Sequence, residues 1–309
     1  MGKIAFVFPG QGAQAVGMGK DAYAEFEASK SIFDRADAAL GFSLSALAFE
    51  GPDEQLKQTA YTQPALLTTS IALLEAFRSR GIEPDYVAGH SLGEYSALVA
   101  ADVLDFEDAV RLVRSRGLFM EQAVPGGKGA MAATLGAERE ALEALCKDVT
   151  ATVGPVELAN VNCPGQIVVS GSSEGVAAVA ERGKEAGAKR VIPLEVSGPF
   201  HSSLMRPAAD QLAEELKKVS FRDAKIPVVV NVNAKPVTEG AELNRLLVEQ
   251  VVSPVLWEDS VRYLIDRGVD TFVEIGSGTV LAGLIKKIDK SVKVISVNSA
   301  AAIAEADLA

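Results

Sequence analysis

The sequence is poor in the residues that build disulfide frameworks, metal centres and nucleic-acid interfaces. Its 309 residues include only two cysteines, Cys146 and Cys163, and two histidines, so we expect neither a disulfide framework nor a metal site. Lysine and arginine number 30 against 41 aspartates and glutamates. The resulting net charge of −11 argues against sequence-independent binding to nucleic acid or to an anionic membrane.

Long apolar runs are missing too. No stretch approaches about 18 uncharged apolar residues, the length that a membrane-spanning helix needs. The first apolar run, residues 4–8, is too short for a signal peptide, and Phe6 stands where a myristoylation motif requires Ser or Thr. Together with the scarcity of cysteine, this pattern predicts a cytoplasmic protein.

What is present is an alternation of strand-like apolar runs and helical patterns. The chain is 48% hydrophobic and 23% charged, which is typical of a folded globular protein, and its length suggests about two domains. Strands are predicted near residues 4–8, 86–89, 227–232, 271–275 and 293–297, and helices near 22–40, 62–80, 106–119, 207–219 and 242–251. This alternation predicts an α/β fold with a mostly parallel sheet covered on both faces, ending in a frayed tail from Ala300.

The segment between two Pro/Gly breaks has a different order of elements. It reads as strand 130–135, helix 138–146, strands 156–161 and 166–170, helix 174–187 and strand 190–196. The order β-α-β-β-α-β is that of a ferredoxin-like unit. We therefore predict a small ferredoxin-like domain at 127–197, inserted into a discontinuous large domain at 1–126 and 198–309, with the site in the cleft beside the hinges.

The strongest local signal is the G-x-S-x-G pattern centred on Ser91. It lies between an apolar strand and an Ala/Leu-rich helix, which is the context of a nucleophile elbow. Of the two histidines, His90 is adjacent to Ser91, and neighbouring side chains on a tight turn diverge. His201, in a loop after the insert, is therefore the candidate base, against the alternative of a hydrogen-bonded structural histidine.

The remaining parts of a serine-based site must come from the main chain. No Asp stands where an α/β-hydrolase triad would place it, but a free carbonyl at the helix end near Gln250 can hold the second nitrogen of His201. The N–H of Leu92, just after the nucleophile, and one from the glycine-rich loop at Gln11 can form an oxyanion hole.

Arg116 falls on the apolar stripe of a predicted helix. That stripe comprises Ala109, Leu112 and Phe119, whereas Arg111 and Arg114 lie off it and are predicted to be solvated. A guanidinium directed into a core or a cleft needs an anionic partner, because burying it unpaired is costly. The pattern alone leaves open whether this partner is a structural carboxylate or an anionic substrate.

Two glycine-rich loops imitate a dinucleotide-binding fingerprint. Gly10, Gly12 and Ala15 have the right spacing, but a helical pattern follows where the second strand and its acidic residue should be. The second loop, Gly276-Ser277-Gly278, carries Leu281 at the third position of the fingerprint. We therefore do not expect dinucleotide binding.

Taken together, the motifs resemble those of the malonyl-CoA:acyl carrier protein transacylases of bacterial fatty acid synthesis. The resemblance covers essentially the whole chain and rests on Phe8-Pro9-Gly10-Gln11-Gly12, Thr62-Gln63-Pro64-Ala65, Gly89-His90-Ser91-Leu92-Gly93-Glu94, Arg116-Gly117, Gly198-Pro199-Phe200-His201 and residues 250–257. It implies an α/β-hydrolase-like large domain with a ferredoxin-like insert.

The resemblance also implies a ping-pong transfer of a malonyl group. Ser91 would carry the group, with His201 as base, the Gln250 carbonyl orienting it and the N–H groups of Gln11 and Leu92 as oxyanion hole. Arg116 would bind the malonyl carboxylate. The other implied substrate-binding residues are His90, Gln63 and Phe200 and, along the thioester arm, Asn160, Asn162, Gln166 and Arg190. No metal and no cofactor are implied.

The implied partners are malonyl-CoA and an acidic acyl carrier protein. Because this chain is itself acidic, docking would need local basic patches, for which the candidates are Lys189 and Arg190, and Lys286 and Lys287 with Lys290. The protein is expected to be a monomer. Two alternatives stay open: a serine thioesterase or esterase with the same Ser–His pair, and a carrier-protein-binding module without activity.

Overall fold

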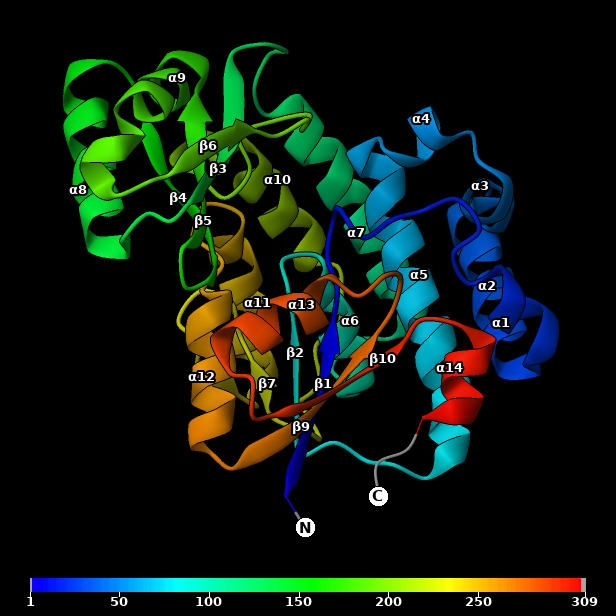
Figure 1. Ribbon diagram of the computed structural model, residues 1–309. Helices are drawn as coiled ribbons and strands as arrows, with labels where there is room; N and C mark the ends of the chain where they lie inside the picture. The colour runs from blue at the N-terminus through cyan, green and yellow to red at the C-terminus, as the bar shows by residue number, and fades with distance from the viewer. Residues whose placement is uncertain (1, 307–309) are drawn as a thin grey trace.

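The computed structural model describes residues 2–306, which two β-sheets organise (Figure 1). The larger sheet has six strands in the order β10-β9-β1-β2-β7-β8. Neighbouring strands are parallel except β8, which is antiparallel to β7. The strands are β1 (Lys3–Phe8), β2 (Tyr86–Gly89), β7 (Val228–Val229), β8 (Pro236–Val237), β9 (Val269–Ile275) and β10 (Lys293–Val297). The predicted α/β class with a mostly parallel sheet is confirmed.

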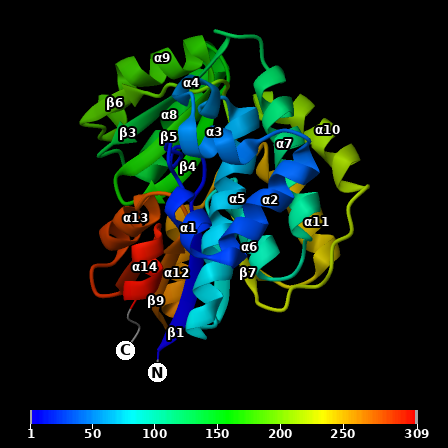
Figure 2. The ribbon, with the colours of Figure 1, turned by 90° about the vertical axis from the view of Figure 1, so that its right-hand side faces the viewer.

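Helices pack around this sheet (Figure 2). They are α1 (Lys20–Glu25), α2 (Glu27–Leu40), α3 (Leu44–Glu50), α4 (Asp53–Leu56), α5 (Thr59–Phe77), η1 (Arg78–Arg80), α6 (Gly93–Ala100), α7 (Phe106–Gln122), η3 (Ser203–Met205), α10 (Arg206–Leu216), α11 (Gly240–Gln250), α12 (Trp257–Asp266), α13 (Val280–Ile288) and α14 (Ala300–Glu305). None of the helices within residues 2–306 is long and apolar enough to cross a membrane.

The central strand β1 contributes to two separate cores. Phe6 and Phe8 join the larger core with α2, α5, α6 and α7, whereas Ala5 and Val7 pack on the opposite face with α12 and α13. Successive side chains of a strand point to opposite faces, so a strand covered on both faces needs apolar residues throughout. This explains the continuous apolar run at residues 4–8.

Four strands form the second sheet, in the order β4-β5-β3-β6 with all neighbours antiparallel. Its elements are β3 (Gly129–Leu135), α8 (Arg139–Thr152), β4 (Val156–Cys163), β5 (Gln166–Ser172), α9 (Ser173–Arg182), η2 (Gly183–Ala186) and β6 (Arg190–Pro193). The chain order is thus β-α-β-β-α-β, as predicted. The domain limits at 126/127 and 197/198 stay a prediction.

Main-chain hydrogen bonds join the second sheet to the segment between α11 and α12. The N–H of Val161 in β4 donates to the carbonyl of Val255 (2.9 Å), and the N–H of Val255 donates to the carbonyl of Ala159 (2.8 Å). Arg139 of α8 also pairs with Asp259 of α12 at 2.9 Å. Figure 1 shows the second sheet beyond the carboxyl ends of β1 and β2, where ligands of α/β proteins commonly bind.

Several predicted boundaries were wrong: the helix predicted at 138–146 continues to Thr152, the one predicted at 22–40 is interrupted at Phe26, and three further differences lie at α5, β6 and β7. Helix α5 begins at Thr59 rather than Thr62, because the N–H of Thr62 already donates to the carbonyl of Gln58, which leaves Pro64 inside the helix. Strand β6 ends at Pro193 rather than residue 196, and residues 194–197 continue as a strap beside the site. The strand predicted at residues 227–232 is ladder-paired only at Val228–Val229.

The tail predicted to fray from Ala300 forms helix α14 instead. The Ser299 side chain accepts a hydrogen bond from the N–H of Ala302 (3.1 Å), which caps the helix, and Ile303 is buried. Arg80 holds the other end by donating to the carbonyls of Ala304 and Ala306. The prediction for residues 307–309 lies outside the described residues.

Candidate functional site

Ser91 lies in the turn between β2 and α6 with a left-handed backbone, φ 51°. The flanking glycines make this turn possible. A Cβ on Gly89 would lie 1.9 Å from the main chain of Gly93, and a Cβ on Gly93 would lie 2.0 Å from the carbonyl oxygen of Phe8. The turn therefore matches the predicted elbow, with the backbone strain that such a turn stores.

His201 meets Ser91 across 110 residues of sequence. Its Nε2 lies 2.7 Å from the Ser91 Oγ, and its Nδ1 lies 2.9 Å from the carbonyl oxygen of Gln250. Because a carbonyl only accepts, Nδ1 carries the proton and Nε2 is free to accept one from the serine. Burial, and next the charge of Arg116, lower the pKa of His201 to about 3, so the imidazole is neutral and able to act as a base at pH 7.

Arg116 is 1% exposed and has only neutral hydrogen-bond partners. It donates to the Gln63 Oε1 (2.9 Å), the Gln250 Oε1 (2.9 Å) and the Ser91 Oγ (3.3 Å). Among residues 2–306 it forms no ion pair, and its Nε has no acceptor. The structural salt bridge that the sequence left open is therefore not found, and the guanidinium lies beside the nucleophile with capacity to bind an anion.

Arg114 differs from the prediction that it is solvated. It is half-buried, and its guanidinium lies 4.1 Å from the centre of the Tyr61 ring and 5.5 Å from that of Phe42. These rings come from α5 and from the turn before α3, and helix spacing on α7 alone does not reveal them. Arg111 is exposed, as predicted.

The glycine-rich loop after β1 packs against the elbow. A Cβ on Gly10 would lie 2.2 Å from the carbonyl oxygen of His90, so this close approach requires glycine. The Gln11 side chain donates to Thr59 (3.0 Å), which also contacts Ser197 of the strap (2.8 Å). Gln11 thus lines the same cavity as Ser91, and Leu92 follows Ser91 in the chain; the role of their N–H groups as oxyanion-hole donors stays a prediction.

The second glycine-rich loop holds no anion site at the start of α13. Both oxygens of the buried Glu274 accept hydrogen bonds there, from the N–H groups of Leu281 (3.0 Å) and Ala282 (2.8 Å). A carboxylate of the chain itself thus occupies the donors that a phosphate would need.

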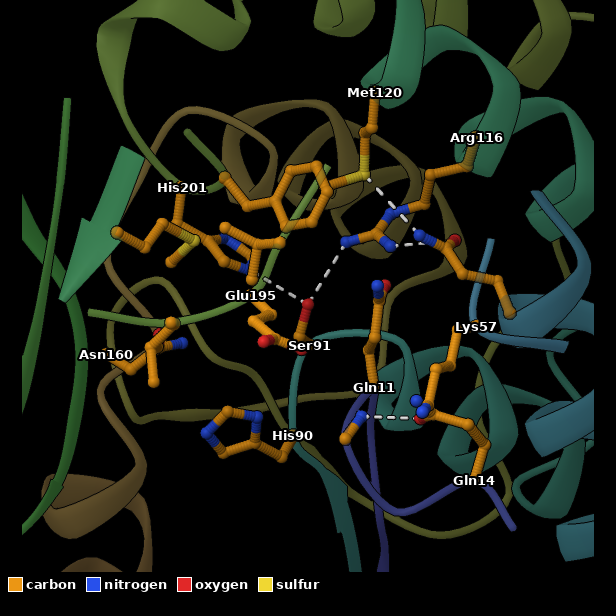
Figure 3. A pocket seen from close by; sticks show the side chains of 16 residues that line it. Gln11, Gln14, Lys57, His90, Ser91, Arg116, Met120, Asn160, Glu195 and His201 are labelled. Carbon is orange, nitrogen blue, oxygen red and sulfur yellow. Dashed lines mark hydrogen bonds between the residues drawn. The ribbon is translucent and has the colours of Figure 1, made fainter. Parts of the chain in front are cut away.

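A cavity of about 530 Å³ surrounds Ser91, His201 and Arg116 (Figure 3). The other lining residues come from the β1 loop, the α4–α5 turn, α5, the elbow, α7, the second sheet, the strap and the loop before η3, and they are Gln11, Gly12, Gln14, Lys57, Gln63, His90, Met120, Met131, Asn160, Leu194, Glu195, Val196 and Phe200. Met120, Met131 and the strap were not anticipated from the sequence. The cavity is thus lined by segments that belong to the larger sheet's domain and by segments of the second sheet, as expected for a cleft beside the insert.

The predicted residues of the insert separate into two groups. Asn160 lines the cavity, and the Asn162 Oδ1 lies 2.8 Å from the His90 Nε2, which turns that histidine away from Ser91. Gln166 and Arg190 do not line the cavity around Ser91; they lie at the end of the second sheet, in register with Leu135. Their role along a thioester arm stays a prediction.

Two buried residues beside Ser91, Asn231 and Glu94, have roles that the sequence did not predict. Asn231, fully buried just after β7, accepts a hydrogen bond from the N–H of Ser91 (2.8 Å). Glu94 of α6 is 1% exposed and accepts one from the N–H of Asn231 (2.7 Å), and burial raises the pKa of Glu94 to about 7. The available signals were a lone polar residue in the apolar run 227–232 and an acid within an Ala/Leu-rich helix.

This chain is similar to known proteins both in sequence and in structure. The acyl transferase domain family matches residues 5–306. A malonyl CoA-acyl carrier protein transacylase of Bacillus subtilis (strain 168) is 56% identical over 298 residues, covering 96% of this chain and 94% of that protein. An acyl carrier protein S-malonyltransferase from Vibrio cholerae has a TM-score of 0.95 at 45% identity, covering 98% of this chain and 99% of that one. A malonyl-transacylase solved in complex with a type II PKS acyl-carrier protein has a TM-score of 0.94 at 42% identity, covering 98% of each chain.

Proposed function

This chain belongs to the acyl transferase family, among the malonyl-CoA:acyl carrier protein transacylases, and from that premise we propose that Ser91 carries the malonyl group between the two thiols. The overall reaction moves malonyl from coenzyme A to the phosphopantetheine thiol of an acyl carrier protein. The single observation that supports this assignment most is the contact of the Ser91 Oγ with both His201 and Arg116.

In the first half-reaction His201 acts as base and then as acid. Its Nε2 takes the Ser91 proton while Oγ attacks the thioester carbonyl, and the oxyanion accepts hydrogen bonds from the N–H groups of Gln11 and Leu92. Collapse of the tetrahedral intermediate breaks the C–S bond, and the proton on His201 goes to the departing coenzyme A thiolate. The Gln250 carbonyl keeps the histidine in the required tautomer throughout.

The second half-reaction reverses these steps with another thiol. His201 takes the proton of the phosphopantetheine thiol, the sulfur attacks the malonyl ester, and the proton returns to Ser91 as the C–O bond breaks. No redox change occurs, and we propose that no cofactor is needed. Assay of the extensively dialysed protein in the presence of a chelator tests this point.

Arg116 supplies selectivity for an acyl group that ends in a carboxylate. A guanidinium with no anionic partner in the described residues gains one when a malonyl group occupies the cavity, whereas an acetyl group leaves it unpaired. The neutral amides of Gln63 and Gln250 hold it beside Ser91 without competing as anions. The esterase alternative is not favoured by the family relationship.

We further propose that the carrier protein docks at the end of the second sheet. Arg190 of β6 pairs in register with Leu135, which pairs with Gln166, and the Lys287 Nζ donates to the Gln166 Oε1 over 3.2 Å. Exposed Lys189, Arg190 and Lys287 therefore lie around one region despite the net charge of −11, and Lys286 is the neighbour of Lys287 on α13. Nearby charges dominate, since screening acts beyond about 8–10 Å.

Charge reversal tests the docking surface. We expect Lys189→Glu and Lys287→Glu to slow transfer to the carrier protein about three- to tenfold and to flatten its salt dependence, while malonylation by malonyl-CoA is unchanged. Lys217→Glu, just after the last residue of α10, is the matched control, since α10 and α13 lie on opposite sides of the molecule (Figure 2). Unaltered carrier-protein kinetics in the first two variants would contradict the proposal.

The compartment and the assembly state complete the proposal. The thiols of Cys146 and Cys163 are both free and buried, which fits a reducing compartment such as the cytoplasm. We propose that the protein acts there as a monomer, which light scattering of the purified protein tests.

Mass spectrometry after mixing with malonyl-CoA alone tests the central step. A stable malonyl adduct on Ser91, absent from Ser91→Ala, is expected. Rapid release of free malonate without an adduct would instead indicate hydrolysis.

A further inference from the structure

Asn231 bonds to both ends of the elbow that presents the nucleophile. Its Oδ1 accepts a hydrogen bond from the Ser91 N–H (2.8 Å), and its Nδ2 donates to the carbonyl oxygen of Gly89 (2.6 Å). The side chain is fully buried, and it comes from the carboxyl end of β7, which pairs with β2. One amide therefore spans the strained turn from outside, in addition to the glycines within it.

The same oxygen also contacts Gln250. The Gln250 Nε2 donates to the Asn231 Oδ1 (3.2 Å) and to the carbonyl oxygen of Ser91 (3.0 Å), while its Oε1 accepts from Arg116 (2.9 Å). Since the guanidinium only donates, the orientation of the Gln250 amide is fixed, and this in turn fixes that of Asn231. Hydrogen bonds thus run without a break from Arg116 through Gln250 and Asn231 to Ser91 and Gly89.

The backbone of Asn231 is held as well. Its N–H donates to the Glu94 Oε2 (2.7 Å), and its carbonyl accepts from the N–H of Leu256 (3.0 Å). Both the side chain and the main chain of this residue are therefore satisfied in the buried region under Ser91, which is the condition for a polar network that specifies one arrangement.

We propose that Asn231 is a positioning residue, which holds the Ser91 elbow and the Gln250 side chain in the arrangement that aims Oγ at the thioester. It does not touch the substrate and acts through Ser91 and Gln250. The inference rests on the proposed malonyl transfer. A displacement of the nucleophile by about 1 Å can lower the rate of a chemical step about 100-fold, because attack needs aligned atoms.

The test compares Asn231→Ala with the wild type in single-turnover malonylation. We expect the rate constant per titrated active site to fall about 100-fold, with the KM for malonyl-CoA changed less than about threefold. The matched control is Asn244→Ala on α11, whose amide donates to the carbonyl of Leu216 (3.3 Å) away from the elbow, and which should keep the wild-type rate. Titrating the sites separates positioning from folding, since partial unfolding lowers the number of sites and not the rate constant of each.

Asn231→Asp keeps the shape of the side chain if the alanine variant does not fold. Aspartate can still accept from the Ser91 N–H and from Gln250, but once ionised it cannot donate to the Gly89 carbonyl, so in assays above about pH 8 we expect a rate constant at least about tenfold below wild type at the same pH. A rate constant per site within about twofold of wild type, in Asn231→Ala or, failing that, in Asn231→Asp, overturns the inference. Absence of the malonyl adduct in the wild type itself would instead overturn the proposed function.

Discussion

The two histidines of the chain lie on different sides of Ser91 (Figure 3), and they contact different groups. On one side His201 contacts the nucleophile and the Gln250 carbonyl, and burial together with the charge of Arg116 lowers its pKa. On the other side His90 contacts Asn162, and its ring lies 5.7 Å from that of Trp257. The histidine next to Ser91 in sequence therefore points away from Ser91, toward the contact between β4 and α12. The comparison shows that adjacency along a tight turn separates side chains.

Alanine substitution of each histidine tests this division most strongly. We expect His201→Ala to slow malonylation of Ser91 about 1,000-fold, because the proton acceptor is lost. His90→Ala removes one hydrogen bond, to Asn162, and should cost no more than about tenfold. Stopped-flow or quenched-flow acylation kinetics measure both, and equal losses would erase the distinction between the two sides.

Arg116 sharpens the chemical side of the comparison. We expect Arg116→Ala to lower kcat/KM for malonyl-CoA about 100-fold or more and to raise the relative use of acetyl-CoA, since only malonyl has a carboxylate to pair. Arg114→Ala, two positions away but stacked on Tyr61, is the control and should keep the preference. Competition between the two thioesters measures it, and an unchanged preference in Arg116→Ala would remove its assigned role.

The lowered pKa of His201 predicts that kcat/KM does not fall with the ordinary pKa of histidine when the pH is lowered. A base with a pKa of about 3 stays unprotonated at pH 5, whereas an ordinary histidine with a pKa near 6.5 would be about 97% protonated and lose about 30-fold in rate. We therefore expect kcat/KM to change less than about twofold between about pH 7.5 and pH 5. A rate that falls with an apparent pKa near 6.5 would show that the site is more hydrated than the structure implies.

Glu94, beneath the reactive side, offers the smallest effect, and it concerns stability. Because burial raises the pKa of this carboxyl to about 7, the folded state binds more protons than the unfolded state above pH 4.5. Its contribution to the free energy of unfolding therefore declines by up to about 3 kcal/mol as the pH rises from about 4.5 to about 7. At higher pH the contribution is constant.

Glu94→Gln keeps an acceptor for the Asn231 N–H but cannot ionise. The Tm of the variant minus the Tm of wild type should thus be a few degrees larger at about pH 8 than at about pH 5. Glu274, whose pKa burial also raises to about 7, is present in both proteins, so its effect cancels. A Tm difference that is independent of pH would contradict the buried, titrating state of Glu94.

Local patterns were sufficient wherever one element decides the outcome. The glycines around Ser91 predicted the elbow, the stripe on α7 predicted the burial of Arg116, and the element order predicted the second sheet. Boundaries failed where a tertiary contact extends or ends an element, as at α14, which Arg80 and a buried Ile303 support.

Contacts between distant segments could not be predicted in the same way. Asn231 looked like a polar residue in a strand, and its bonds to Gly89, Ser91 and Gln250 exist only because β7 pairs with β2 and α11 ends beside them. Arg114 looked solvated because Tyr61 and Phe42 come from other elements.

By itself, the sequence determined which groups are available: one elbow serine, two histidines and an arginine among apolar neighbours. Only the tertiary structure decided their roles, because it placed His201 rather than His90 at 2.7 Å from the nucleophile and left Arg116 without an anionic partner among the described residues. The physical reason is that turns and helix periods fix where a side chain starts, whereas burial and the packing of separate strands fix what it meets.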